Sequence, residues 1–308
     1  MSRQSLWFRV WYVCLALAWA LFPSAMGFAA PRGQAGMQSP GIMLAAVSRD
    51  DAVLSGGIST GIRTPDGIAD VEPIAWLTPS GAWQDLPCNY HWLTDADISR
   101  CRQFASAYLS QSHQYAVVSA DGYGATIHAP PSSLNDCYAF AARGVYSGPS
   151  ILRTTLAASD PAAFLSSPPL KPVEGIAYTQ VLTAFAAASP VHLNTLAGIR
   201  LYQVHWGGRS LIVVERSFTD FASASPSVVP DVKLVFAIGQ IVQRRFHILF
   251  WKDNTEDENE QVLGTLLLRT GQQFLVTSIN SPEAQFFRIY AMQNGSIRMV
   301  FSGGGSSC

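Results

Sequence analysis

A series of eight apolar segments, separated by tight-turn residues, constrains the fold of this chain more than any other feature. The segments cover 199–206, 209–218, 232–238, 241–251, 262–269, 272–279, 285–292 and 296–302. Short turn signals lie between several of them, at Gly207-Gly208, Gly239-Gln240, Thr270-Gly271 and Asn294-Gly295. Two-residue turns of this kind join antiparallel neighbours. The pattern therefore predicts an antiparallel β-meander of about eight strands, closed as a barrel or folded as a sandwich.

The region before this series, residues 71–165, carries mixed helix and strand signals. A hairpin is indicated around Pro79-Ser-Gly81, and strands are indicated on both sides of Asp121-Gly122. Between them, Thr94 with an acidic residue three positions later favours a helix start, and apolar residues then recur at helical spacing over 95–110. These signals predict a small α+β domain, so the fold class is α+β, mainly β.

Proline-rich and glycine-rich stretches suggest the remaining boundaries. Residues 31–70 lack a sustained period and predict a flexible linker, with one short strand near Ile42 to Val47. Consecutive prolines predict an extended linker over 166–173. A helix is then expected from about Glu174 to Ala188, leading into the β domain that ends at 302. The glycine-rich residues 303–308 are expected to form a flexible tail.

The first 30 residues have the composition of a signal peptide. Arg3 and Arg9 precede thirteen apolar residues from Val10 to Phe22, and small residues follow Pro23. This apolar run is too short to span a bilayer, and no later segment reaches 18 uninterrupted apolar residues. We therefore expect a secreted, periplasmic or cell-surface protein with no stable transmembrane segment after cleavage.

Charge argues against one large class of partners. Charged residues make up 13% of the chain, and the part after residue 30 has 18 basic and 21 acidic residues, a net charge of about −3. Nucleic-acid binding needs basic side chains that neutralise phosphates, and no basic stripe is present. The expected partner is instead an extracellular or envelope ligand, a glycan or a protein.

Four cysteines follow the predicted signal peptide, an even number that favours disulfides in an exported chain. They are Cys88, Cys101, Cys137 and Cys308. Three pairings are open, and the sequence does not choose among them. Cys308, the last residue given, could also cross-link two chains or stay free.

Two groups of residues could form a catalytic site or a metal site. Asp121, His128 and Cys137 lie close in sequence and could supply an orienting acid, a base and a nucleophile. An oxidised cysteine and an ordinary Asp-Gly turn explain two of the three more simply. The acidic run from Asp253 to Glu260 could hold calcium through four carboxylates, those of Asp253, Asp257, Glu258 and Glu260. A solvated loop is the competing interpretation, and no other cofactor is expected.

Tryptophans at strand ends suggest a binding role. Trp206 lies beside Gly207-Gly208 and Trp251 beside the acidic run, where an indole face could stack on a sugar or peptide. Core packing is the competing interpretation for both. Since strand signals dominate the C-terminal half of the sequence, the leading hypothesis is a non-catalytic binding or structural protein. A secreted hydrolase using Asp121, His128 and Cys137 is the alternative.

Overall fold

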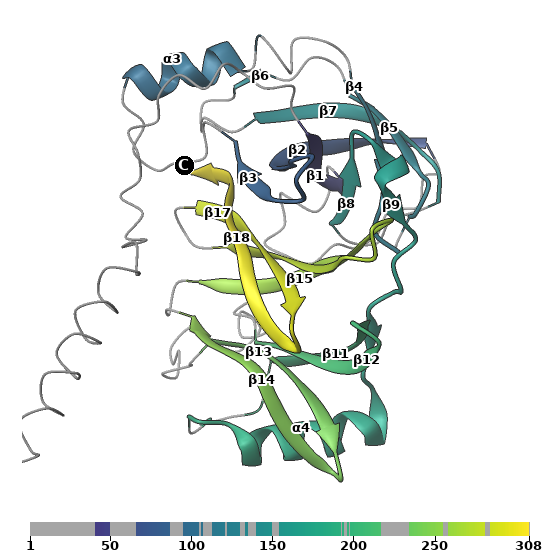
Figure 1. The fold of residues 1–308 in the computed structure, drawn as a ribbon, viewed down its shortest axis with the longest axis vertical. Coiled ribbons are helices and arrows are strands. Elements are labelled where there is room, and N and C mark those ends of the chain that lie inside the picture. Colours follow the sequence, from purple (N-terminus) through teal and green to yellow (C-terminus); the bar gives the residue numbers. More distant parts are fainter. Residues whose placement is uncertain are drawn as a thin grey trace, which may run out of the picture. The chain divides into compact units, whose positions relative to one another are not determined.

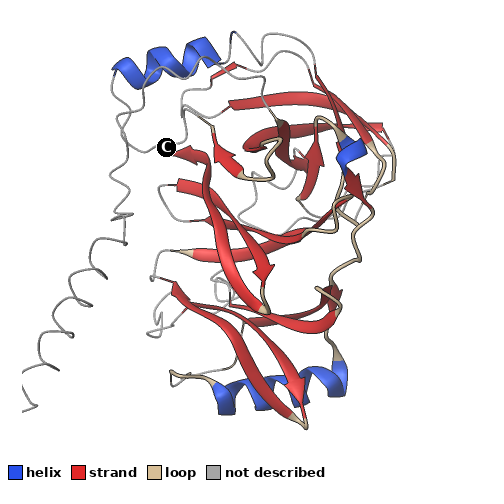
Figure 2. Ribbon diagram, in the orientation of Figure 1, coloured by secondary structure: helices blue, strands red, loops and turns tan. Residues whose placement is uncertain are grey.

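A computed structural model gives the fold of the 308-residue chain. It describes residues 41–49, 66–86, 95–104, 106, 113–120, 122–129, 133–134, 140–149, 154–191, 193, 196, 198–216, 234–254, 258–280 and 284–307. All of these fall in one compact unit, Gly41–Cys308. Most of the described residues are in strands, and helices are few (Figure 2). The protein is therefore mainly β, and every strand pair is antiparallel.

The first part of this unit is a six-stranded barrel. Its strands pair in the closed order β1-β2-β7-β5-β4-β8, with β8 returning to β1. β3 pairs at the edge of β2 and β6 pairs with β7. The bounds are β1 (Ile42–Arg49), β2 (Asp66–Leu77), β3 (Trp83–Asp85), β4 (His113–Val117), β5 (Thr126–Ala129), β6 (Ser133–Leu134), β7 (Phe140–Ser147) and β8 (Thr155–Ala158).

The alternation of side chains along β1 divides its apolar residues between two cores. Met43, Ala45 and Val47 pack inside the barrel, together with residues of a helix, α3 (Asp95–Phe104). Leu44 and Ala46 point the other way and join a second core. Successive side chains of a strand face opposite sides, so an apolar run such as this one serves two cores. The outer side of the barrel is therefore buried as well where β1 forms the wall.

The second part is a sandwich of two five-stranded sheets (Figure 1). One sheet, which we call the outer sheet, has the order β10-β11-β12-β13-β14; the other, which we call the middle sheet, has the order β18-β17-β16-β15-β9. The bounds are β9 (Phe164–Leu165), β10 (Lys171–Pro172), β11 (Ile199–Trp206), β12 (Arg209–Arg216), β13 (Leu234–Val242), β14 (Arg245–Asn254), β15 (Asn259–Leu268), β16 (Gln273–Asn280), β17 (Ala284–Gln293) and β18 (Ser296–Ser307).

Both faces of the middle sheet are buried. On β16, Phe274 and Val276 join the core shared with the barrel, whereas Leu275 between them joins the core shared with the outer sheet. On β17, Phe287 and Tyr290 divide in the same way. The layers therefore run from the barrel to the middle sheet and then to the outer sheet.

The helix α4 (Gly175–Ala188) covers the remaining face of the outer sheet. Phe185 on its buried side makes an edge-on contact with Phe246 and stacks on Trp251, both on β14. The sequence predicted this helix at nearly the same residues, which the structure confirms. No helix among the described residues is long and apolar enough to cross a membrane.

Several expectations need correction. All eight C-terminal strands form, but as two four-strand meanders in a sandwich, so the barrel alternative is wrong for this region. The α+β domain expected over 71–165 is not confirmed: its described residues are mostly barrel strands, with α3 as their one α-helix.

The short strand expected near Ile42 is β1, which pairs on both edges. The tail expected to be flexible is in strand up to Ser307, paired with β17.

One turn also differs from the prediction. Gly239 lies inside β13 at a bulge, and the turn to β14 is formed by Gln243 and Arg244. A Cβ at Gly239 would lie 2.3 Å from the ring of Phe246. Glycine is therefore placed there by packing rather than by a turn. The turns at Gly207-Gly208, Gly271 and Asn294-Gly295 have the positive φ angles that tight hairpins need, as predicted.

Candidate functional site

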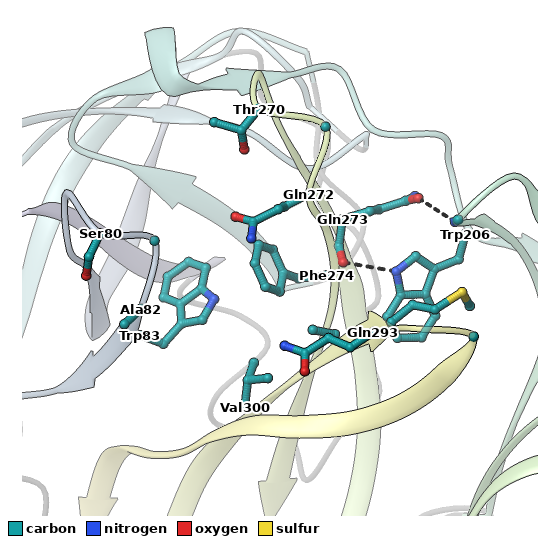
Figure 3. Close-up of a pocket in the computed structure, with 16 residues that line it drawn as sticks. Ser80, Ala82, Trp83, Trp206, Thr270, Gln272, Gln273, Phe274, Gln293 and Val300 are labelled. Atoms are coloured by element: carbon teal, nitrogen blue, oxygen red, sulfur yellow. Dashed lines mark hydrogen bonds between the residues drawn. The ribbon is translucent and has the colours of Figure 1, made fainter.

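Four turns that are far apart in the sequence meet around a cavity of about 780 Å³ (Figure 3). They are the β2–β3 turn of the barrel and the β11–β12, β15–β16 and β17–β18 turns of the sandwich. We call this cavity the four-turn cleft. Its volume lies within the range of about 300–1,000 Å³ that small-ligand sites occupy. Turns held by packed sheets commonly carry binding sites.

Each turn contributes a glycine with a positive φ angle to the lining. The angles are 82° at Gly81, 58° at Gly207, 86° at Gly271 and 78° at Gly295. Residues with a Cβ rarely adopt this conformation. A Cβ at Gly271 would meet nothing within 4 Å, so a ligand can approach the backbone there, whereas the side chain of Met292 covers Gly207.

Hydrogen bonds of Gln273 fix two of these turns to each other. Its Nε2 donates to the carbonyl of His205 at 2.7 Å, and its Oε1 accepts from the amide of Gly207 at 3.1 Å. The indole Nε1 of Trp206 donates to the carbonyl of Gln273 at 3.0 Å (Figure 3). The β11–β12 and β15–β16 turns are thus held in a defined geometry before any ligand arrives.

Aromatic rings form part of the wall. Trp83 lies edge-on to Phe274, with ring centroids 5.4 Å apart. The Nε1 of Trp83 is shielded from solvent, and none of the described residues accepts a hydrogen bond from it. In Figure 3 this nitrogen is on the side of the ring that faces Phe274 and Gln293. A buried donor without an acceptor is costly, and a weak contact to an aromatic face compensates only in part.

The rest of the lining is polar but uncharged. Gln272 and Gln293 are exposed and offer amide donors and acceptors, and Ser80 and Thr270 add hydroxyls. No ionisable side chain occurs among the sixteen lining residues. The cleft can therefore hydrogen-bond and pack against a ligand, but these residues offer no acid, base or counter-charge.

Ionisable groups gather instead between the two sheets of the sandwich. Arg288 donates to Glu260 and Glu258, and Tyr290 donates to Glu260. Burial alone would lower the pKa of Arg288, but the two carboxylates outweigh it and raise that pKa. Burial, followed by the charge of Glu260, raises the pKa of Tyr290 above its usual range. We describe this group as structural, since its side chains satisfy one another.

The residues considered for catalysis are only partly described. His128 is exposed on β5, whereas Asp121 and Cys137 lie outside the described residues. Whether the three meet therefore stays untested. Among the residues that the structure describes, no group of three or more His, Cys, Asp or Glu side chains could hold a metal.

The residues considered for calcium have other partners. Glu260 and Glu258 bind Arg288, and the carboxylate of Asp253 accepts from the indole of Trp251 at 2.9 Å. Asp257 lies outside the described residues. The carboxylates that can be placed thus serve the fold.

The two tryptophans considered for stacking occupy packed positions. Trp206 lines the four-turn cleft, but its side chain is fully buried and belongs to the sandwich core. Trp251 is half-buried under α4, against Phe185. Trp206 therefore presents no open face to a sugar, and Phe185 covers one face of Trp251.

Cysteine pairing can be followed at one position. Cys101 on α3 is fully buried at the end of the barrel core and is disulfide-bonded. Cys88, Cys137 and Cys308 lie outside the described part of the chain. The choice among the three pairings therefore remains open.

No protein-family model matches the chain, and neither a curated protein nor a solved structure does. The cleft must therefore be interpreted from its own geometry. Sequence reasoning did not find Trp83 or Gln272 as site residues, because the turns that carry them meet only in the folded protein. The glycine-containing turns were visible in the sequence, but their convergence was not.

Proposed function

We propose that this chain is an exported, non-catalytic binding protein that holds a sugar unit of a neutral glycan in the four-turn cleft. The observation that carries the proposal is the lining: amide and hydroxyl groups, with no ionisable side chain among the sixteen lining residues. Sugars combine apolar ring faces with many hydroxyls. A site for them needs neutral groups that both donate and accept hydrogen bonds, and here such groups lie above buried aromatic rings.

The glutamine side chains of the cleft support the assignment of a sugar as the ligand. The side-chain amide of Gln273 is fully used in holding the turns, whereas the side-chain amides of Gln272 and Gln293 are at exposed residues on the rim and form no hydrogen bond with the described residues. A rigid base with adaptable polar groups above it is the usual arrangement of a small-ligand site. A cationic ligand is disfavoured, because the lining holds no carboxylate and the guanidinium of Arg209 lies beside Gly295.

The N-terminal sequence supports the exported location. Arg3, Arg9 and the apolar run that ends at Phe22 are typical of a secretory signal. Glycans are abundant outside the cytoplasm, so the compartment and the ligand agree. N-terminal sequencing of the protein recovered from outside the cytoplasm tests this part, and an intact Met1 on cytoplasmic protein would contradict it.

Titration of the purified mature protein with a panel of neutral and acidic oligosaccharides tests the binding itself. We expect a neutral member to bind, and Gln272→Ala and Gln293→Ala each to weaken it roughly 3- to 10-fold, the cost of a lost hydrogen bond. Gln114→Ala is the matched control, since Gln114 is exposed on β4 and outside the cleft. The proposal fails if only acidic sugars or peptides bind, or if the cleft variants behave like the control.

The hydrolase alternative is tested separately by counting free thiols in the native protein. A disulfide at Cys137 would remove its proposed nucleophile. A reactive thiol at Cys137, together with loss of a hydrolytic activity in His128→Ala, would favour the hydrolase over the binding protein.

A further inference from the structure

The tip of the β13–β14 hairpin combines exposed apolar and basic side chains. Ile241 is 39% exposed and Val242 is 42% exposed. Gln243, Arg244 and Arg245 follow directly, and all three are exposed. We call residues 241–245 the hairpin tip. Isoleucine and valine are among the residue types most often buried, and here two of them are adjacent and exposed next to basic side chains at the end of a hairpin.

The backbone of this tip is unfavourable for the residues that form it. Gln243 has a φ angle of 49° and Arg244 one of 63°. Two-residue turns with this geometry favour asparagine and glycine, and the chain uses such residues at Gly207-Gly208 and Asn294-Gly295. Here it keeps two long side chains in a left-handed conformation. Backbone strain of this kind collects at functional positions.

The two arginines are available for an external partner. No carboxylate among the described residues pairs with Arg244 or Arg245, in contrast to Arg288 in the sandwich core. Val242 is paired with Arg245 across the hairpin, and paired residues lie side by side on one face. Ile241 is on the opposite face, beside Phe246. The tip therefore presents aliphatic surface on both faces and positive charge at its end.

We propose that the hairpin tip docks on an anionic lipid surface. Ile241 and Val242 enter the boundary between headgroups and acyl chains, and Arg244 and Arg245 contact lipid phosphates. The hairpin reaches past α4 in Figure 1. A convex tip with apolar flanks fits a deformable bilayer interface better than the surface of an acidic protein, which would need a matching groove. This surface is separate from the four-turn cleft and does not rest on glycan binding.

Such a contact is weak and depends on both kinds of side chain. Basic residues near an anionic membrane contribute through electrostatic attraction, which salt screens, and apolar residues contribute through burial. The mature protein should therefore sediment with vesicles of phosphatidylcholine and phosphatidylglycerol, and much less with phosphatidylcholine alone. Raising the salt concentration should release most of it.

Paired variants identify the tip as the contact. Ile241→Ser with Val242→Ser, and Arg244→Gln with Arg245→Gln, should each lower the bound fraction several-fold. Arg298→Gln with Met299→Ser is the matched control, because Arg298 is exposed and Met299 is 48% exposed on β18, far along the chain from the tip. The control should bind as the unaltered protein does.

A turn replacement separates binding from folding. Gln243→Asn with Arg244→Gly introduces the residues that this turn prefers, so it should raise the melting temperature and still weaken vesicle binding. The proposal is overturned if the unaltered protein does not bind anionic vesicles. It is also overturned if the arginine variant loses binding while the Ile241 and Val242 variant keeps it, which would indicate an acidic polymer instead of a bilayer.

Discussion

The Nη1 of Arg288 lies 2.6 Å from the Oε2 of Glu260, and the two side chains are only 6% and 0% exposed. Thr277 and Tyr290 donate to the other oxygen of Glu260, at 2.8 and 2.6 Å. These contacts join β15, β16 and β17 on the face of the middle sheet that packs against the outer sheet. A charged pair so deeply buried is tolerated only when its remaining hydrogen bonds are satisfied.

Removing one partner of this pair should be strongly destabilising. Arg288→Met leaves Glu260 buried without its counter-charge, and we expect a loss of about 3–5 kcal/mol in the free energy of unfolding. Lys252→Met is the control, because Lys252 lies 3.7 Å from Glu258 and both side chains are about one quarter exposed. Such a partly exposed pair contributes less than about 1 kcal/mol. Equal losses in urea denaturation would contradict the structural role of Arg288.

Glu72 on β2 should make stability depend on pH. Burial, followed by the charge of Asp70, raises the pKa of Glu72 from 4.5 to about 7. Its Oε1 is enclosed, and none of the described residues donates to it. Between these two pH values the folded protein binds the proton more tightly than the unfolded chain does. Stability should therefore fall as the pH rises from about 4.5 to 7 and stay lowered above that.

Glu72→Gln should remove this dependence. At pH 8 the variant should be more stable than the unaltered protein by up to about 3 kcal/mol, and at pH 4 the two should be alike. The exposed Glu174→Gln serves as the control. Chemical denaturation over a pH series measures the difference, and a Glu72→Gln curve that runs parallel to the unaltered protein would rule out this residue as the source.

The two tryptophans of the four-turn cleft should respond differently to replacement by phenylalanine. Trp206→Phe loses the hydrogen bond from Nε1 to the carbonyl of Gln273, whereas Trp83→Phe removes a donor that has no acceptor within the described structure. We expect Trp206→Phe to cost about 1 kcal/mol more. Thermal melts of both variants check this, and a larger loss for Trp83→Phe would show that its indole nitrogen has a partner.

Gly304 on β18 should tolerate alanine less well than Gly271 does. Both have positive φ angles, 66° and 86°. A Cβ at Gly304 would lie 2.4 Å from the carbonyl oxygen of Ile74, whereas one at Gly271 would meet nothing within 4 Å. We expect about 1–2 kcal/mol for Gly271→Ala from backbone strain, and about 2–5 kcal/mol for Gly304→Ala, where overpacking adds to it. Similar unfolding midpoints would contradict the close approach of β18 to β2.

The sequence predicted those helices and strands whose signals lie within a few neighbouring residues. β11 forms over the residues that were expected, and α4 differs by one residue. At the β13–β14 turn the same reasoning was wrong, because Gly239 signals a turn in the sequence but admits the ring of Phe246 in the structure. Gln243 and Arg244, which form the turn, carry no turn signal.

The barrel and the cleft depend on contacts that no local pattern reveals. The barrel closes where β2 pairs with β7, with Val71 opposite Ala142. The cleft forms where Trp83 of the barrel meets Phe274 of the sandwich. Both contacts join residues tens to hundreds of positions apart. Because side chains alternate along a strand, the sequence shows which residues share a face of that strand. It does not show which other strand covers either face.

The middle sheet, with apolar side chains on both faces, has a mechanical consequence. Neither the barrel nor the outer sheet can detach without wetting one face of β15 to β18, which would expose the side chains of Phe287 on one side or Tyr290 on the other. Heating should therefore give one sharp calorimetric peak for residues 41–308. A ligand that stabilises the barrel would therefore raise the melting temperature of the outer sheet, and a ligand that stabilises the outer sheet would raise that of the barrel.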